Sequence, residues 1–149
     1  MLEERFDEAV AATDPRERAA LAAEAGDQLA VHVAAEEDLF YPAVKARRTE
    51  DILLESLEEH LSLKRLLADL LDLPADDATY EAKLKVLTEQ TEHHHHEEEE
   101  HLFPQVRKCL EADELEALGA EMLARQKRLL REGQPREAMA EQTEKAAVL

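Results

Sequence analysis

The stretch HVAAEEDLFYPAV at residues 32–44 governs the interpretation of this sequence, because it returns at residues 94–106 as HHHEEEEHLFPQV. In both copies a His stands four residues before a Glu, and a proline follows six residues after that Glu. Residues four apart lie on the same face of an α-helix, one turn from each other. The repeat therefore predicts a duplicated helical unit, each copy presenting one imidazole and one carboxylate from a single face.

Around these two stretches, proline and glycine divide the chain into helical segments. Asp14 is a suitable N-cap and Pro15 fits the first helical position. Gly133 followed by Pro135 is a typical helix stop. Pro42 is expected to kink its helix near the C-terminal end. We expect helices over residues 2–12, 15–46, 51–71, 78–110 and 113–133, the last capped by Asp113, with a loop at residues 73–77.

The composition favours an all-α protein. Ala, Leu, Glu, Lys and Arg dominate the 149 residues, and these are strong helix formers, whereas the β-branched residues that strands favour are sparse. Because the predicted loops are short, we expect an antiparallel four-helix bundle with an extra C-terminal helix. Residues 1–133 are expected to form this bundle as one domain. Residues 134–149 have weak hydrophobic periodicity and are expected to form a flexible or frayed tail.

The charge of the chain argues against two classes of partner. Lys and Arg number 18 against 36 Asp and Glu, which gives a net charge of -18. Such a chain repels nucleic acid and anionic membrane surfaces, so neither is an expected partner. The sequence contains no apolar run of membrane-spanning length, and we expect no signal peptide because its N-terminus has neither a basic nor an apolar segment. Cys109 is the single cysteine, which excludes an internal disulfide and a thiolate metal cluster. A cytoplasmic location is the default expectation.

The two His–Glu pairs are candidates for metal binding. His32 and Glu36 share a helical stripe with the apolar Leu29, and His94 and Glu98 form the equivalent pair in the second copy. An imidazole and a carboxylate are costly to bury unless a partner satisfies them. A divalent metal is such a partner, since imidazole suits Fe, Zn, Ni and Cu, and carboxylates can bridge two hard ions. Plain His–Glu hydrogen bonds are the alternative, because Glu is frequent in this chain.

His60 is the expected ligand from a third helix. It stands among apolar residues such as Leu57 and Leu61. A lone histidine in this setting is more often a satisfied core residue than a ligand. Together with the two pairs, it supplies the third imidazole that a metal centre between helices needs.

The run HHHHEEEEH at residues 93–101 needs a choice of register. Consecutive residues point around most of the circumference of a helix, so the four His cannot all meet at one centre. The repeat selects His94 and Glu98. The pair His93 and Glu97 keeps the same spacing one residue earlier and stays open as an alternative. His101 lies on the stripe of His94 and Glu98 and is a candidate extra ligand or supporting donor.

These stretches resemble the hemerythrin-like HHE cation-binding family: residues 31–42 resemble its second-helix motif, 58–60 its third and 93–108 its fourth. The resemblance covers residues 2–130. It implies a four-helix bundle around a non-haem di-iron centre, and family members bind O2 reversibly, sense oxygen or iron, or handle peroxide and nitric oxide. The implied ligands are Glu36 and Glu98, which would bridge or share the irons, and His32, His60 and His94 as terminal ligands.

One ligand of the family pattern has no counterpart in this sequence. Members usually carry a His in the first helix, shortly before a segment like the one at residues 5–8, and Met1 falls just after that point. The repeat agrees, because shifting His60 back by one repeat places its counterpart before Met1. This implies either a start further upstream or an incomplete centre that holds one iron tightly and one weakly. Restoring an upstream His is expected to raise the iron content towards two per chain.

Three functions follow as hypotheses. The leading one is an oxygen- or iron-binding protein rather than a dedicated catalyst, with a homodimer left open. The second is a di-iron oxidase, peroxidase or catalase-like enzyme. Ferritin-like sites use Glu-x-x-His on two helices, and the first half of this chain lacks that spacing. The third is a helical interaction module, either metal-free and indifferent to chelators or bound to zinc.

Overall fold

The computed structural model describes residues 2–46 and 48–149, and within these ranges it contains helices and no strands. The prediction of an all-α protein is confirmed. The elements are α1 (Leu2–Ala11), α2 (Pro15–Ala35), η1 (Glu36–Phe40), α3 (Tyr41–Val44), α4 (Glu50–Leu71), α5 (Tyr80–Glu97), η2 (Glu98–Leu102), α6 (Phe103–Cys109), α7 (Ala112–Glu132) and α8 (Pro135–Ala140).

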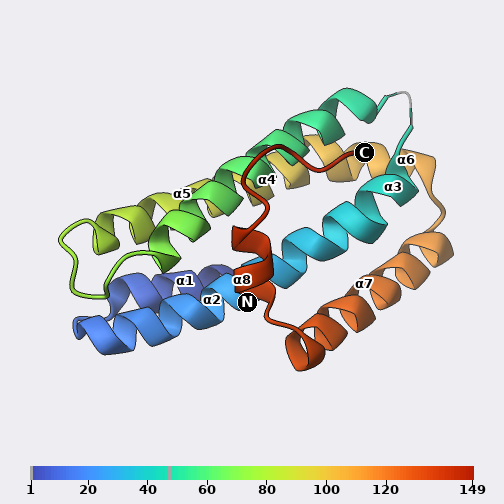
Figure 1. The fold of residues 1–149 in the computed structure, drawn as a ribbon. Helices are drawn as coiled ribbons and strands as arrows, with labels where there is room; N and C mark the ends of the chain where they lie inside the picture. Colours follow the sequence, from blue (N-terminus) through green and yellow to red (C-terminus); the bar gives the residue numbers. More distant parts are fainter. Residues whose placement is uncertain (1, 47) are drawn as a thin grey trace.

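The long helices lie side by side along the molecule (Figure 1). Helix α1 packs on α2 and α5, and α4 packs on α5. Helix α7 lies outside this group, along α2 and η1, and none of its residues is buried. The extra C-terminal helix therefore forms an outer layer over α2.

Local sequence explains where the helices begin. Asp14 caps α2 by accepting a backbone N–H, and Pro15 is the first helical residue, as predicted. Helix α7 begins with a capping box: the side chain of Glu111 accepts the N–H of Glu114, and the Glu114 carboxylate accepts the N–H of Glu111 at 3.3 Å. Asp113, the expected cap, lies instead within the first turn, where its charge complements the helix dipole.

A π turn interrupts the helix in each repeated segment. In η1 the N–H of Tyr41 donates to the carbonyl of Glu36, and in η2 the N–H of Phe103 donates to the carbonyl of Glu98. Each π turn closes at the residue before a proline, whose ring clashes with the carbonyl four residues earlier in an unbroken α-helix. The interruption expected at Pro42 therefore takes the form of a π turn. Single π turns are frequent at functional sites.

The buried apolar side chains form two clusters, and the polar positions lie between them. From α2 through η1 to α3, residues up to Val33 belong to the first cluster, and those from Phe40 onward belong to the second. Along α4 the order is reversed, with Leu57 in the second cluster and Leu63 in the first. Several apolar side chains near the polar positions lie in or against these clusters: Leu29, Val33, Phe40, Leu57, Leu63 and Phe103.

The segment after Gly133 differs from the flexible or frayed tail that the sequence predicted. It forms α8, which packs on α2 and α4. Met139 is 3% exposed in the first apolar cluster, and the Arg136 guanidinium lies 2.8 Å from the Asp27 carboxylate. Weak periodicity failed to reveal this helix because six residues supply only one apolar anchor, and the ion pair joins positions that are distant in the sequence.

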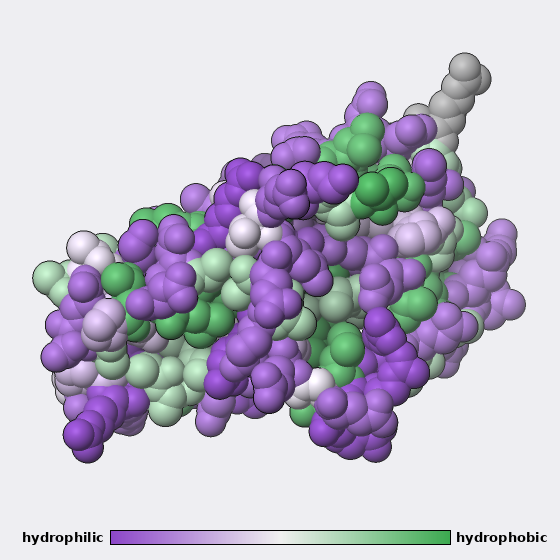
Figure 2. Space-filling model, in the orientation of Figure 1, coloured by the Kyte–Doolittle hydropathy of each residue, from purple (hydrophilic) through white to green (hydrophobic). Residues whose placement is uncertain are grey.

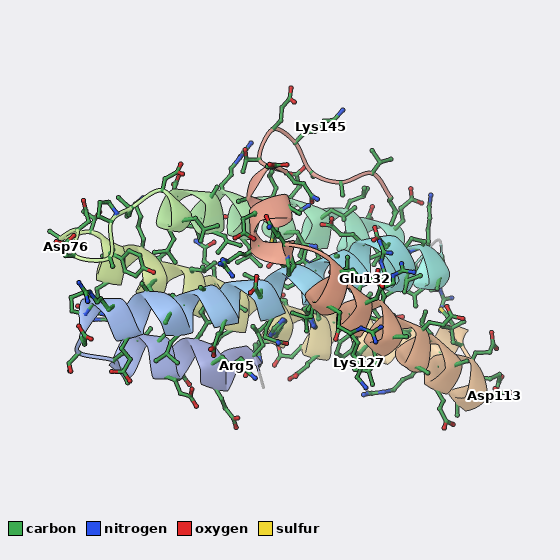
Figure 3. All side chains as sticks on the ribbon, turned by 60° about the horizontal axis from the view of Figure 1, so that its bottom comes forward. Arg5, Asp76, Asp113, Lys127, Glu132 and Lys145 are labelled. Atoms are coloured by element: carbon green, nitrogen blue, oxygen red, sulfur yellow. The ribbon has the colours of Figure 1, made fainter. Side chains whose placement is uncertain are left out.

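Charged side chains cover the outside of the molecule. Figure 3 shows six of them projecting from the ribbon: Arg5, Asp76, Asp113, Lys127, Glu132 and Lys145. Figure 2 shows hydrophilic residues over most of one face, with hydrophobic ones in smaller groups. None of the helices in the described ranges has the combined length and apolar character that crossing a membrane requires.

Candidate metal centre

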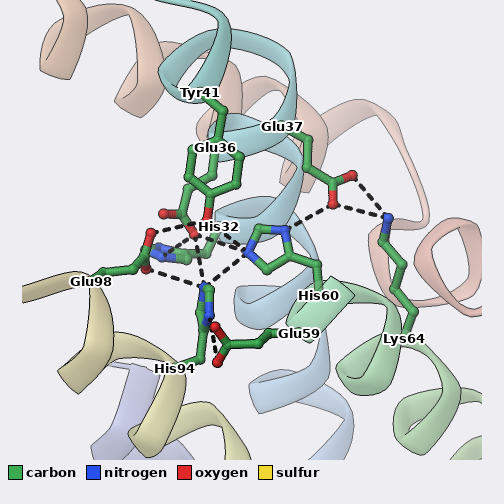
Figure 4. A network of polar contacts seen from close by, with 9 residues as sticks. All are labelled: His32, Glu36, Glu37, Tyr41, Glu59, His60, Lys64, His94 and Glu98. Carbon is green, nitrogen blue, oxygen red and sulfur yellow. Dashed lines mark hydrogen bonds and ion pairs between the residues drawn. The ribbon is translucent and has the colours of Figure 1, made fainter. Parts of the chain in front are cut away.

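Five predicted site residues meet in the interior, as Figure 4 shows. Glu36, His60, His94 and Glu98 are each at most 2% exposed, whereas the side chain of His32 is 34% exposed. They come from α2, η1, α4, α5 and η2, so helices distant in the sequence build one site. The two pairs predicted from the repeat and the lone His of α4 are therefore neighbours.

Glu36 is the centre of the cluster. Its Oε1 lies 3.0 Å from Nε2 of His32, 3.4 Å from Nε2 of His60 and 3.9 Å from Nε2 of His94. Glu36, His60 and His94 each offer one ligand atom, and these three atoms lie within 4.8 Å of one another. A single carboxylate oxygen thus faces three imidazole nitrogens.

Glu98 and Tyr41 form the other side of the cluster. Oε1 of Glu98 lies 3.2 Å from Nε2 of His94, and its Oε2 accepts a hydrogen bond from the Tyr41 hydroxyl at 3.0 Å. The same hydroxyl lies 3.2 Å from Nε2 of His60. The rings of Tyr41 and His60 also stack, with centroids 5.4 Å apart.

The donor set fits a metal ion. Nε2 of His60 and Nε2 of His94 lie 3.0 Å apart, and both face carboxylate oxygens. Within the described ranges, the buried Nε2 of His32 and Oε1 of Glu36 face each other at 3.0 Å but make no well-aligned hydrogen bond. Buried polar atoms normally make one. Once the imidazoles have lost their protons, the lone pairs that converge here can be satisfied by a cation, and nitrogen and oxygen donors suit iron and zinc.

Two further carboxylates lie near the Nδ1 atoms of His60 and His94, on the side of each ring that faces away from the centre. Nδ1 of His60 lies 2.8 Å from Oε2 of Glu37, and Nζ of Lys64 donates to both oxygens of that carboxylate at 2.9 and 3.0 Å. Nδ1 of His94 lies 3.5 Å from Oε2 of Glu59 but makes no hydrogen bond among the described residues. The carboxylate at Nδ1 of His60 fixes the orientation of that ring and leaves its Nε2 to face the centre.

The two central carboxylates titrate differently. Burial alone raises the pKa of Glu36, but the neighbouring imidazoles of His32 and His60 outweigh burial and hold it well below its usual range. Burial and the negative charge of Glu36 raise the pKa of Glu98 to about 7, against the opposing effect of His94. The pair shares its protons unevenly, so Glu98 is the carboxylate that titrates near neutral pH.

His94 is the imidazole most affected by this charge. Burial lowers the pKa of His94, but the contacts with Glu36 and Glu98 outweigh burial and raise it to about 10. In the metal-free chain His94 therefore carries a proton at neutral pH.

Metal binding is expected to release protons and to weaken as the pH falls. His94, with a pKa of about 10, and Glu98, with a pKa of about 7, must both lose their protons to become ligands. With at least one proton released per site, the affinity is expected to fall about tenfold or more for each pH unit between about pH 8 and pH 6. Calorimetry in two buffers of different ionisation enthalpy counts the protons. An affinity independent of pH contradicts this prediction.

The alternative register and the extra ligand do not join the cluster. His93 is exposed, and Oε2 of Glu97 lies 3.4 Å from Nε2 of His101 at the surface. The side chain of His101 is 59% exposed. The register of the repeat, with His94 and Glu98, is the one that faces the interior.

Sequence reasoning missed Tyr41, Glu37 and Lys64. The π turn explains Tyr41, because its i to i+5 hydrogen bond brings Tyr41 round to the face of Glu36, where regular helical spacing placed Phe40. For Lys64 a signal existed: it stands four residues after His60, on the buried stripe of α4, and is 1% exposed. A buried Lys needs an acidic partner, which Glu37 supplies.

Comparison with known proteins gives one match. The family model described as Hemerythrin, the hemerythrin HHE cation binding domain, matches residues 1–106. No curated protein and no solved structure matches the chain. The matched range contains every residue of the cluster described above.

Proposed function

This chain belongs to the hemerythrin HHE cation-binding family, and we propose that it holds a non-haem di-iron centre that binds O2 or a related small ligand such as peroxide or nitric oxide. One observation carries the proposal: the buried Oε1 atom of Glu36 faces Nε2 of three histidines at 3.0 to 3.9 Å without a well-aligned hydrogen bond among the described residues. Imidazoles and carboxylates together are the donor set of non-haem iron sites.

In this proposal His32, His60 and His94 would be terminal ligands, and Glu36 and Glu98 would be shared between the two ions. Both carboxylates lie in the interior between α2, α4 and α5. In this proposal, α1, α2, α4 and α5 are the antiparallel four-helix bundle that forms the metal-binding domain. When bound, two ferrous ions supply the electrons that O2 binding requires.

The residues around the centre control the entry of a small ligand and exclude water. A cavity of about 330 Å³ reaches His32 and Glu98 from the surface, with Leu2 and Phe103 as apolar walls. It is wide enough for a small ligand, whereas the two apolar clusters close the other sides of the site. The chain's own contribution is therefore to orient the ligands, exclude water and admit a small molecule.

Anaerobic reconstitution tests this function. Ferrous iron is added to the metal-free chain without oxygen, and the absorption spectrum is recorded before and after O2 is admitted. We expect new visible charge-transfer bands that fade when O2 is removed. The zinc-loaded chain is the control and shows no such bands, because zinc has no redox chemistry. An iron-loaded chain whose spectrum does not respond to O2 contradicts the proposal.

An enzyme that turns over peroxide is the second candidate, and Tyr41 favours it. Burial, together with the charges of Glu36 and Glu98, raises the pKa of the Tyr41 hydroxyl, so it keeps its proton beside the centre. A neutral hydroxyl 3.0 Å from Glu98 and 3.2 Å from His60 would be a hydrogen-bond donor beside a bound peroxide. Steady consumption of peroxide, rather than reversible bands with O2, identifies this alternative.

A further inference from the structure

We propose that His95 ligates the second metal ion of the pair. This inference rests on the proposed function, because it assigns a ligand to the same centre. It concerns a residue outside the repeat, since the equivalent of His95 in the first copy is Val33.

The geometry brings His95 to a second group of donors. His32, His95 and Glu98 each offer one ligand atom, and these atoms lie within 4.8 Å of one another. This group has no residue in common with that of Glu36, His60 and His94, but the two groups are in contact, because Glu36 lies 3.0 Å from His32 and Glu98 lies 3.2 Å from His94. The rings of His32 and His95 meet edge to face, with centroids 4.8 Å apart. The cluster therefore offers two adjoining sets of three donors, which the two carboxylates connect.

The ring of His95 is held with one nitrogen free. Nδ1 lies 3.1 Å from Oε1 of Glu3, which makes Nδ1 the nitrogen that donates to the carboxylate. Nε2 is buried and has no hydrogen-bond partner among the described residues. A carboxylate behind one nitrogen and a free lone pair on the other is the usual arrangement of a metal-bound histidine.

Helix α1 takes part in this site through Glu3. Helix α1 packs on α5, and this contact places Glu3 beside His95. Leu2, Glu3, His32, His95 and Glu98 all line the cavity of about 330 Å³. A second ion held by these residues would therefore be open to the cavity, through which a small ligand can enter.

Within the His run, orientation distinguishes His95 from its neighbours. His93 is exposed, and the side chain of His96 is 62% exposed and lies 3.0 Å from Glu100. The His95 side chain is only 16% exposed. Successive residues on a helix point in different directions, so His94 faces one donor group and His95 the other.

Iron counting in matched variants tests the assignment. The chain is expected to bind two irons, and His95→Gln is expected to bind one, with the first iron held as tightly as before. His93→Gln and His96→Gln, which change neighbouring residues of the same run, are expected to keep two. Thermal melting by circular dichroism checks that each variant is folded. Glu3→Gln, at an exposed position, is a second variant that tests the support of the His95 ring. It is expected to weaken the second iron by about 10- to 100-fold.

The outcomes separate this inference from the proposed function. A wild-type chain that binds no iron overturns the proposed function and the inference together. If the chain binds two irons and His95→Gln also binds two, the centre stands and the role of His95 is wrong. If the wild-type chain and His95→Gln both bind one iron, His95 completes no second site and the inference is equally overturned.

Discussion

Glu36→Gln is expected to abolish iron binding at both positions of the centre. The change replaces an ionised oxygen that faces His32, His60 and His94 at 3.0 to 3.9 Å with a neutral amide. Residues that only support ligands are worth about 10- to 100-fold in metal affinity, so a carboxylate shared by two ions is expected to cost more than about 100-fold. Anaerobic equilibrium dialysis against ferrous iron measures the loss.

Glu100→Gln is the matched control for this variant. Glu100 lies on the corresponding π turn, η2, but its side chain is 52% exposed and contacts His96 and His101 rather than the centre. It is expected to bind iron like the wild-type chain. If Glu36→Gln and Glu100→Gln retain the same iron content, Glu36 is not a ligand.

Lys64→Met is expected to destabilise the metal-free protein by about 3 kcal/mol, because removing one partner of a buried ion pair leaves the other charge uncompensated. Lys64 is 1% exposed, and it donates to both oxygens of Glu37. His60 then remains the only partner among the described residues for a carboxylate whose side chain is 9% exposed. For a chain of this size, the loss corresponds to a melting temperature about 10 °C lower. Urea denaturation followed by circular dichroism measures it.

The control for this prediction is a surface lysine. Lys83 lies 3.6 Å from Asp69, with side chains 36% and 62% exposed, and exposed pairs contribute about 0 to 1 kcal/mol. Lys83→Met is therefore expected to cost well under 1 kcal/mol. The double variant Lys64→Met with Glu37→Gln is expected to recover part of the stability, because it removes both charges. Equal stability of Lys64→Met and Lys83→Met contradicts the importance of the buried pair.

The convergence of the site could be predicted because helical spacing and the repeat determine it. Glu36 stands four positions after His32, and Glu98 stands four positions after His94, which places each pair on one helix face. The repeat then indicates that the two faces are equivalent. His60 was identifiable as a polar position within an apolar stripe of α4.

Other features depend on contacts between distant segments. Glu3 reaches His95 only because α1 packs on α5, so no local pattern distinguishes His95 from the rest of its run. Regular periodicity also cannot anticipate the π turn that brings Tyr41, rather than Phe40, to the site. The packing of Met139 in the core was equally invisible, because α8 spans six residues.

Anomalous X-ray diffraction at the iron absorption edge, on crystals of the anaerobically reconstituted chain, tests the central claim most directly because it locates the metal. We expect one peak among Glu36, His60 and His94 and a second beside Glu98 and His32. Iron bound only at exposed histidines such as His93, or the absence of any peak between the helices, contradicts a metal centre in this fold.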